Sequence, residues 1–471
     1  MIQLLGFLIL PAIGVIALAV KRLCSSIMSD EKIVFGVILA TAFLFFTGLF
    51  LGFAGISINL VSSIDFAFTL ETNGLSIPFM LLAVVLPALG LWSAHHEIKK
   101  NTNLFYIFYL LSYMSLIMIF ISANLISFFI FWEVVLISFF FIIAFWGDEK
   151  IRKRASMKFL IFTQFGSLML LGAFILMFLY TGSFDINVIS NLASTIPSPI
   201  ADVIFLFVLI TAIVKMPIFP LHSWLPDAHV SAPTSGSVLL AGVLLKLGGY
   251  ALLLFGVLLF PSITSLFQKP LIILGVFTAI YATFVASTQN DFKRLIAYSS
   301  IFYMALVFVG LASMSYFGES GAVLLMVSHG FIVGMLFVLA GILKKKTGTR
   351  DLNKLGGLMA RMPVYTLFLT IAIIATLGVP GLSNFPAELL VFLGAYGAYT
   401  LSLVSLVGVL IATNYYLGAL KRILFSSLGK TLSKVTDISM SDAIQLSLFT
   451  IPIIVLGIAP NLLMGAFNLL I

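Results

Sequence analysis

Apolar runs of about 20 residues recur along the whole sequence, and they constrain its fold more than any other feature. An α-helix of about 20 residues crosses the ~30 Å hydrocarbon core of a bilayer, where only helices and closed barrels satisfy their backbone hydrogen bonds. The sequence therefore predicts an all-α integral membrane protein with about fourteen transmembrane helices. The predicted spans are 2–20, 33–54, 76–94, 103–122, 125–146, 158–180, 200–219, 237–259, 272–288, 294–313, 321–343, 363–400 (one interrupted crossing), 401–420 and 445–468.

The positions of the basic residues give an independent test of this count. Nearly all of the 25 lysines and arginines fall in loops that follow odd-numbered spans, and only Lys269 is expected in an opposite-side loop. Because cytoplasmic loops are rich in lysine and arginine, we expect a multi-pass protein of the cell (inner) membrane with both termini on the outer face. Met1 to Leu5 carry no basic side chain, so no cleavable signal peptide is expected. The net charge of +8 then fits contact with anionic lipid, not with nucleic acid.

Four charged residues fall well inside predicted spans, away from the span ends: Glu133, Lys215, Lys246 and Glu388. A charge at the bilayer centre costs about 2.5–3.5 kcal/mol, so such residues usually face the bundle interior and mark ion pathways. Burial disfavours the charged form of a lysine and a nearby carboxylate favours it, so a moving carboxylate can switch a lysine between holding and releasing a proton. Glu133 is the natural partner for a lysine on a neighbouring helix. The alternative is a buried ion pair that only locks helices together.

Two of the predicted spans contain helix-breaking residues beside a charge. Pro217 and Pro220 follow Lys215 in the seventh span, and Pro380 and Pro386 precede Glu388 in the twelfth. Proline removes a backbone donor and clashes with the preceding turn, and irregular backbone survives at membrane depth only beside protein or a wet cavity. Spans five apart run in opposite directions, which favours two inverted five-helix repeats over incidental kinks. The expected units are an N-terminal three-helix segment (1–102), repeats at 103–259 and 272–420, and a C-terminal loop and helix (421–471).

The remaining polar signals are weaker. His329, in the eleventh span, could relay protons because histidine titrates near neutrality, although a neutral hydrogen-bonded histidine explains it equally well. His222, Asp227 and His229 follow the first break, where we expect a polar, hydrated connection and no metal. The single cysteine, Cys24, rules out an internal disulfide and any cluster that needs several thiolates.

The segment from Lys215 to His229 reads KMPIFPLHSWLPDAH, and 232–248 reads APTSGSVLLAGVLLKLG. This pattern resembles the core motif of antiporter-like subunits of respiratory complex I. More narrowly, it resembles the M-type subunits of NADH–quinone oxidoreductase and their mitochondrial subunit-4 counterparts. Further matching motifs follow in order over roughly 75–420: FWE at 131–133, DFKRLIAYSS at 291–300, SHG at 328–330 and TRDL at 349–352.

The resemblance implies a role for each matching residue. Glu133 is the modulating carboxylate, Lys215 the central switching lysine, and Lys246 and His329 belong to a hydrophilic axis within the membrane. Glu388 matches an acidic residue from which protons leave. L-type, N-type and Mrp antiporter proteins usually carry lysine there, which favours the M type. Two positions depart from the family pattern. Tyr303 replaces a common histidine and could act through its hydroxyl and water, and the pair Pro386-Ala387 before Glu388 replaces a small, flexible pair.

The resemblance also implies the setting. We expect redox-coupled proton translocation beside L-type and N-type neighbours, as a pumping subunit of an NADH dehydrogenase (quinone)-type translocase. No cofactor is expected on this chain, and NADH, FMN, iron–sulfur clusters and quinone are expected on other subunits. The alternatives are a Mrp-type Na⁺/H⁺ antiporter subunit, a membrane-arm subunit of a ferredoxin or deazaflavin dehydrogenase or of a hydrogenase, and a non-pumping scaffold.

Overall fold

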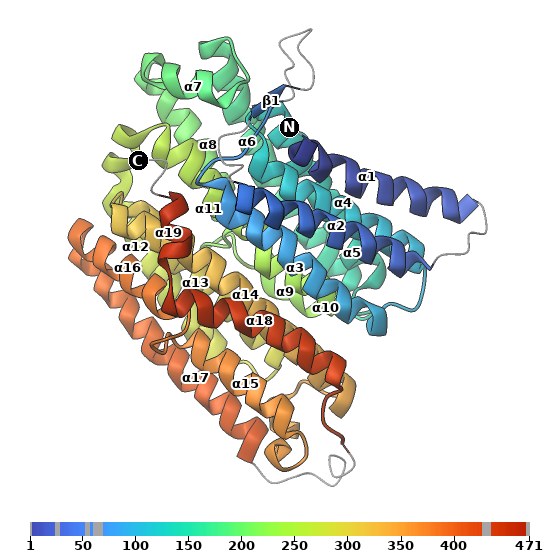
Figure 1. Cartoon of the computed structure of the whole chain (residues 1–471). Coiled ribbons are helices and arrows are strands. Elements are labelled where there is room, and N and C mark those ends of the chain that lie inside the picture. Colours follow the sequence, from blue (N-terminus) through green and yellow to red (C-terminus); the bar gives the residue numbers. More distant parts are fainter. Residues whose placement is uncertain (1, 24–28, 52–56, 60–68, 426–434, 468–471) are drawn as a thin grey trace.

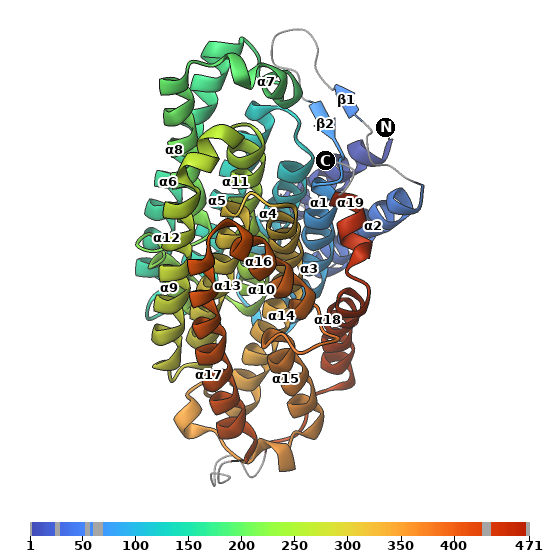
Figure 2. The ribbon, with the colours of Figure 1, turned by 90° about the vertical axis from the view of Figure 1, so that its left-hand side faces the viewer.

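The computed structural model describes residues 2–23, 29–51, 57–59, 69–425 and 435–467. Cys24, Lys430 and Lys434 lie outside these residues. Within them the chain forms a helical bundle, shown in two views in Figures 1 and 2.

Thirteen helices in the described part of the chain are long and apolar enough to cross a membrane. An interrupted pair, α15 (Pro363–Thr376) and α16 (Asn384–Ala398), adds a further crossing, which confirms the predicted fold class and its span count. The thirteen are α1 (Ile2–Leu23), α2 (Asp30–Leu51), α3 (Ser76–Glu97), α4 (Thr102–Ile121), α5 (Leu125–Trp146), α6 (Arg152–Thr181), α8 (Ser198–Lys215), the run from α10 (Thr234–Leu239) through η2 (Leu240–Leu244) and α11 (Lys246–Leu252) to η3 (Leu253–Leu258), α12 (Pro261–Ser287), α13 (Phe292–Ala312), α14 (Tyr316–Thr347), α17 (Ser405–Phe425) and α18 (Met440–Ile458).

Both predicted helix breaks are present. The seventh crossing stops where α8 ends at Lys215, and it resumes as the short helix α9 (Trp224–Ser231). The twelfth stops at Thr376 and resumes at Asn384. The arrangement of the two halves as inverted repeats stays a prediction.

The short elements were not foreseen. They are β1 (Ser57–Asn59) and β2 (Thr69–Glu71), which pair antiparallel, α7 (Ile186–Leu192), α19 (Asn461–Phe467), and the 3₁₀ turns η1 (Ala193–Thr195), η4 (Leu352–Lys354), η5 (Leu358–Ala360) and η6 (Thr400–Val404). The eighth crossing also contains two π-helical stretches, η2 and η3, which hydropathy cannot distinguish from α-helix.

The loops that follow odd-numbered crossings meet at one end of the bundle, which we call the basic face (98–101, 147–151, 232–233, 288–291 and 348–362). Backbone hydrogen bonds hold this end of the bundle together: Asp148 N donates to the carbonyl oxygen of Ser231, the last residue of α9, at 2.8 Å, and Leu352 N donates to Asn290 O at 2.8 Å. The strands and α7 lie at the opposite end, toward which α1 begins and α19 ends (Figure 2). The assignment of that end to the outer side of the membrane stays a prediction.

Several of the basic residues that were expected in loops lie on helices instead. Lys158 lies on α6, Lys293 in the first turn of α13, and Lys269 in the third turn of α12. These helices begin earlier than predicted, because a transmembrane helix can extend beyond the hydrocarbon layer and carry charged residues in its end turns.

Burial separates central crossings from peripheral ones. The apolar segments of α14, of α13 and of the run from α10 to η3 are almost completely enclosed, whereas those of α1, α2, α17 and α18 are mostly exposed. The predicted intramembrane charges Lys215 and Lys246 therefore lie on or beside the most deeply buried part of the bundle.

Candidate functional site

Lys215 is the last residue of α8 and is fully buried. Pro217 and Pro220 cannot continue the helix, so the chain turns until α9 begins at Trp224. The ammonium nitrogen of Lys215 makes no hydrogen bond. It lies 4.7 Å from the centroid of the Trp132 ring, within the range of a cation–π interaction.

Glu133 follows Trp132 on α5 and is half-buried. Its carboxylate interacts electrostatically with Lys215, and one of its oxygens, Oε1, is buried without a hydrogen-bond partner. The predicted pairing is therefore an interaction through space, and neither group is fixed by a direct hydrogen bond to the other.

Gly248 brings α11 close to this lysine. A Cβ at position 248 would lie 2.8 Å from Lys215 Cβ and 3.0 Å from the backbone nitrogen of Met216. Only glycine permits this approach of the two helices, so the eighth crossing packs directly against the first break.

Lys246 begins α11, directly after the π-helix η2 and Leu245, and is fully buried. Its ammonium nitrogen donates to the carbonyl oxygen of Ala241 and lies 2.9 Å from His329 Nδ1. The other ring nitrogen of His329 is buried without a partner. The structure therefore brings together two residues, 83 positions apart, that the family resemblance had placed on one hydrophilic axis.

Tyr303 continues this line toward the second break. Its ring centroid lies 5.4 Å from that of His329, and its hydroxyl donates to the carbonyl oxygen of Thr376, the last residue of α15. A tyrosine hydroxyl thus connects the histidine to the end of a broken helix.

The second break holds a compact polar cluster. Ser328 Oγ lies 2.6 Å from Ser383 Oγ and donates to Asn384 Oδ1 at 2.5 Å, while Asn384 Nδ2 donates to Thr376 O at 3.3 Å. One turn further along α16, Glu388 is 7% exposed and its Oε1 is buried without a partner. Sequence reasoning had missed Thr376, Ser383 and Asn384, although all three lie within or beside the proline-containing break.

Gly378 allows the chain to turn beside Glu388. Its φ is +66°, in the left-handed region that side chains disfavour. A Cβ at this position would lie 3.0 Å from Glu388 Oε2. Pro380 lies in the same turn, and Pro386 lies within the first turn of α16, where proline is tolerated.

The three polar residues after the first break do not form one cluster. Asp227 forms ion pairs with Lys158 (2.9 Å) and Arg294 (3.0 Å). His222 Nε2 lies 3.2 Å from the hydroxyl of Tyr281. His229 is fully buried, with both ring nitrogens unpartnered, and stacks on a phenylalanine of α14. In the described residues, no three His, Cys, Asp or Glu side chains gather as a metal site would require.

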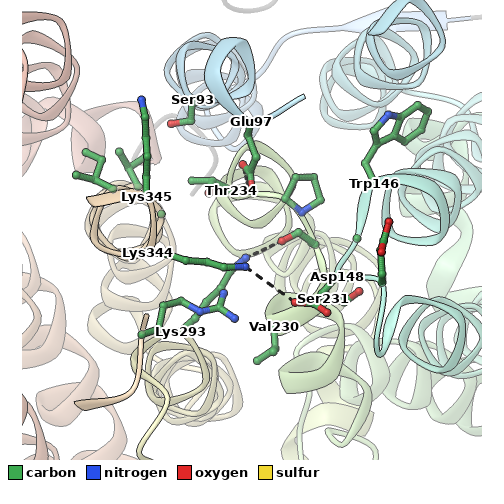
Figure 3. Close-up of a pocket in the computed structure, with 18 of the residues that line it drawn as sticks. Ser93, Glu97, Trp146, Asp148, Val230, Ser231, Thr234, Lys293, Lys344 and Lys345 are labelled. Carbon is green, nitrogen blue, oxygen red and sulfur yellow. Dashed lines mark hydrogen bonds and ion pairs between the residues drawn. The ribbon is translucent and has the colours of Figure 1, made fainter. Parts of the chain in front are cut away.

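A cavity of about 630 Å³ opens at the basic face, and its lining includes Val230 and Ser231, which follow His229 in the sequence (Figure 3). Lys293 and Lys344 extend from one side, and Asp148 and Trp146 line another. Lys293 is 4% exposed and donates to Ala232 O at 2.6 Å. Sequence reasoning assigned Lys293 to a basic loop, and its burial could not be read from the charge pattern.

Together these groups form a broken line of titratable and hydroxyl side chains through the bundle. It runs from Glu133 and Lys215 through Lys246, His329 and Tyr303 to the cluster beside Glu388. Several members carry buried polar atoms without a protein partner, and buried polar groups normally have a hydrogen-bond partner, often water. Such a line can pass protons if water bridges the gaps.

Comparison with known proteins supports a relationship over most of the chain. The family model described as NADH:quinone oxidoreductase/Mrp antiporter, TM matches residues 122–413. NADH-quinone oxidoreductase subunit M of Rickettsia conorii is 35% identical over 411 residues, which cover 87% of this chain and 83% of the relative.

Solved structures agree. A chain of respiratory complex I from Thermus thermophilus superposes with a TM-score of 0.86 at 27% identity, covering 99% of this chain and 98% of the other. A chain of the Mrp complex from Dietzia sp. superposes with a TM-score of 0.88 at 15% identity, covering 98% and 96%. The second likeness concerns the fold alone.

Proposed function

The chain belongs to the NADH:quinone oxidoreductase/Mrp antiporter transmembrane family, with an M-type, antiporter-like sequence, and on that premise we propose that it translocates protons within a complex I-type assembly. The observation that carries the proposal is the buried Lys215, which ends a broken helix without a hydrogen bond and interacts electrostatically with Glu133. A lysine in this position gains or loses a proton when its carboxylate neighbour moves.

Protons would pass along the polar line inside the membrane. Lys215 would exchange its proton with Lys246, and His329 and Tyr303 would connect Lys246 to the second break. Glu388 would be the point of release. His222, His229 and Asp227 have a lesser role in this scheme, in which they border the entry from the basic face.

The energy would come from neighbouring subunits. This chain would hold no electron carrier, while NADH, FMN, iron–sulfur clusters and quinone would bind to other subunits. A change in a neighbour, of L-type or N-type, would alter the position or the charge of Glu133 and so bias the protonation of Lys215. The chain would lie in the inner membrane with the basic face toward the cytoplasm.

The test is Lys215→Ala in the assembled complex, with electron transfer and ΔpH followed together in sealed vesicles. We expect proton translocation to fall while assembly stays intact. Lys354→Ala is the matched control, because the side chain of Lys354 is 72% exposed at the basic face.

Wild-type pumping and electron transfer in Lys215→Ala would refute the central role of this lysine and favour a non-pumping scaffold. Sodium-dependent proton flux without redox chemistry would instead favour a Mrp-type antiporter.

A further inference from the structure

A set of buried hydroxyl groups lies between α13 and α17 and has no place in the proton path described above. Ser299 is on α13, and Tyr415 and Tyr416 are adjacent on α17. Their exposed fractions are 1%, 6% and 0%. Buried hydroxyls in a membrane bundle are costly unless they are hydrogen-bonded, so this gathering needs an explanation.

Two of the three hydroxyls are hydrogen-bonded to each other, and the third has no partner. Ser299 Oγ lies 2.6 Å from the hydroxyl of Tyr416. The ring centroids of Tyr415 and Tyr416 are 4.9 Å apart. The hydroxyl of Tyr415 is buried and has no hydrogen-bond partner. An ordered water there would satisfy Tyr415, because a hydroxyl both donates and accepts.

This set of hydroxyl groups begins at the polar line of the proposed path. Tyr303, which connects His329 to the second break, lies four residues after Ser299 on α13, so the two side chains lie on the same face of that helix, one turn apart. Tyr303 is the member of the polar line on α13, so the hydrogen-bonded pair of Ser299 and Tyr416 lies one helical turn from the line.

The set of hydroxyl groups lies on the side of Tyr303 that is nearer to the basic face. α13 starts there at Phe292, so Ser299 lies about 6 Å nearer to that face than Tyr303, at 1.5 Å per residue. α17 runs in the opposite direction and ends at the basic face with Phe425, so Tyr416 lies nearer to that face than Tyr415 does. Ser299 Oγ also donates to the carbonyl oxygen of Ile296 at 2.8 Å, one residue short of a full turn nearer to the basic face.

We propose that Ser299, Tyr415 and Tyr416 form a side branch of the proton path, which connects Tyr303 to the basic face between α13 and α17. The branch rests on the proposed proton translocation. It supplies the second half of the subunit with protons directly, instead of through Lys215 and Lys246 alone. Each step passes a proton from one hydroxyl or water oxygen to the next, and no covalent bond between heavy atoms changes.

The first test removes hydroxyl groups singly. Ser299→Ala, Tyr415→Phe and Tyr416→Phe keep the packing nearly unchanged, and we expect each to lower the number of protons translocated per electron in sealed vesicles. Ser299→Thr keeps the hydroxyl, so its number of protons translocated per electron should match that of the wild type. The matched control is Tyr365→Phe, which removes a buried tyrosine hydroxyl that donates to Leu339 O at 3.2 Å, away from this chain.

Unchanged translocation in all three variants, beside a deficient Lys215→Ala, would overturn the branch and leave the proposed function intact. An equal loss in Tyr365→Phe, or no rescue by Ser299→Thr, would show that packing is responsible and would also overturn it.

The second test does not depend on pumping. Tyr415→Cys in a Cys24→Ser background carries one thiol, which a membrane-impermeant reagent should modify from the basic face during turnover. Modification from that face supports a hydrated branch even if Lys215→Ala pumps normally, in which case only the proposed function of Lys215 fails. No modification from the basic face would overturn the branch.

Discussion

The contact between Gly248 and the end of α8 makes a quantitative prediction. A methyl group at position 248 would lie 2.8 Å from Lys215 Cβ and from Met216 Cγ. Carbon atoms prefer a separation of about 3.5–4.0 Å, so α11 and the end of α8 must separate by up to about 1 Å in Gly248→Ala.

The cost follows from two opposing effects. Overpacking a buried contact costs about 1–3 kcal/mol. Replacing glycine by alanine inside a helix gains about 1 kcal/mol of helix propensity. Gly418→Ala on α17 has the same propensity gain, and a Cβ there would meet no atom within 4 Å. The difference between the two variants therefore isolates the contact, and it corresponds to about 5- to 150-fold in the population of the native packing.

Both variants should be prepared in the assembled complex, and the apparent melting temperature and the protons translocated per electron should be measured. We expect Gly248→Ala to lower both quantities, because the shift moves the ammonium group of Lys215 relative to Trp132 and Glu133. Gly418→Ala should match the wild type or exceed its stability. If Gly248→Ala behaves as Gly418→Ala does, the packing argument is wrong.

Two further substitutions test other contacts. Gly378→Ala and Gly348→Ala both place alanine at a positive φ (+66° and +76°), which costs about 1–2 kcal/mol each. Only the alanine at position 378 crowds Glu388 Oε2, so proton pumping should fall in Gly378→Ala alone. Equal pumping in the two variants would count against the position of Glu388 in the path. Gln445→Leu removes two hydrogen bonds from α18 to α3 (2.7 and 2.9 Å) and should cost about 1–3 kcal/mol of stability, measured by thermal inactivation. The control is Ser447→Ala, because the Ser447 hydroxyl bonds only within α18. Equal rates of inactivation in the two variants would refute the expectation.

The number of crossings, and the two breaks, could be predicted because the signals are local. Hydropathy reports the solvent around each segment, and the distribution of lysine and arginine reports the side on which each loop lies. Pro217 and Pro380 act on the backbone within one turn of their own position. The four intramembrane charges were predicted to face the bundle interior because a charge inside an apolar run has few other places to go. Lys215, Lys246 and Glu388 are buried, and Glu133 is half-buried.

The partners of these residues could not be predicted, because contacts between helices depend on how distant crossings pack. The Lys246–His329 contact joins α11 to α14, and Ser328 reaches Asn384 across the second break. Asp227 is an example of the same limit. Its sequence neighbours suggested a local connection with two histidines, whereas its ion pairs go to α6 and α13.

The hydrogen bonds between α18 and α3 have a consequence for biogenesis. Gln445 donates to Leu89 O and Ser93 Oγ, and Trp92 Nε1 donates to Ser441 Oγ at 2.7 Å. Crossings enter the membrane in chain order, so the indole N–H of Trp92 on α3 gains its partner on α18 only when that last described membrane-length helix has been inserted. An insertion intermediate therefore presents this N–H group to lipid or to an insertion factor. Closure of the bundle by α18 is a natural checkpoint at which a complete subunit becomes distinguishable from a truncated one.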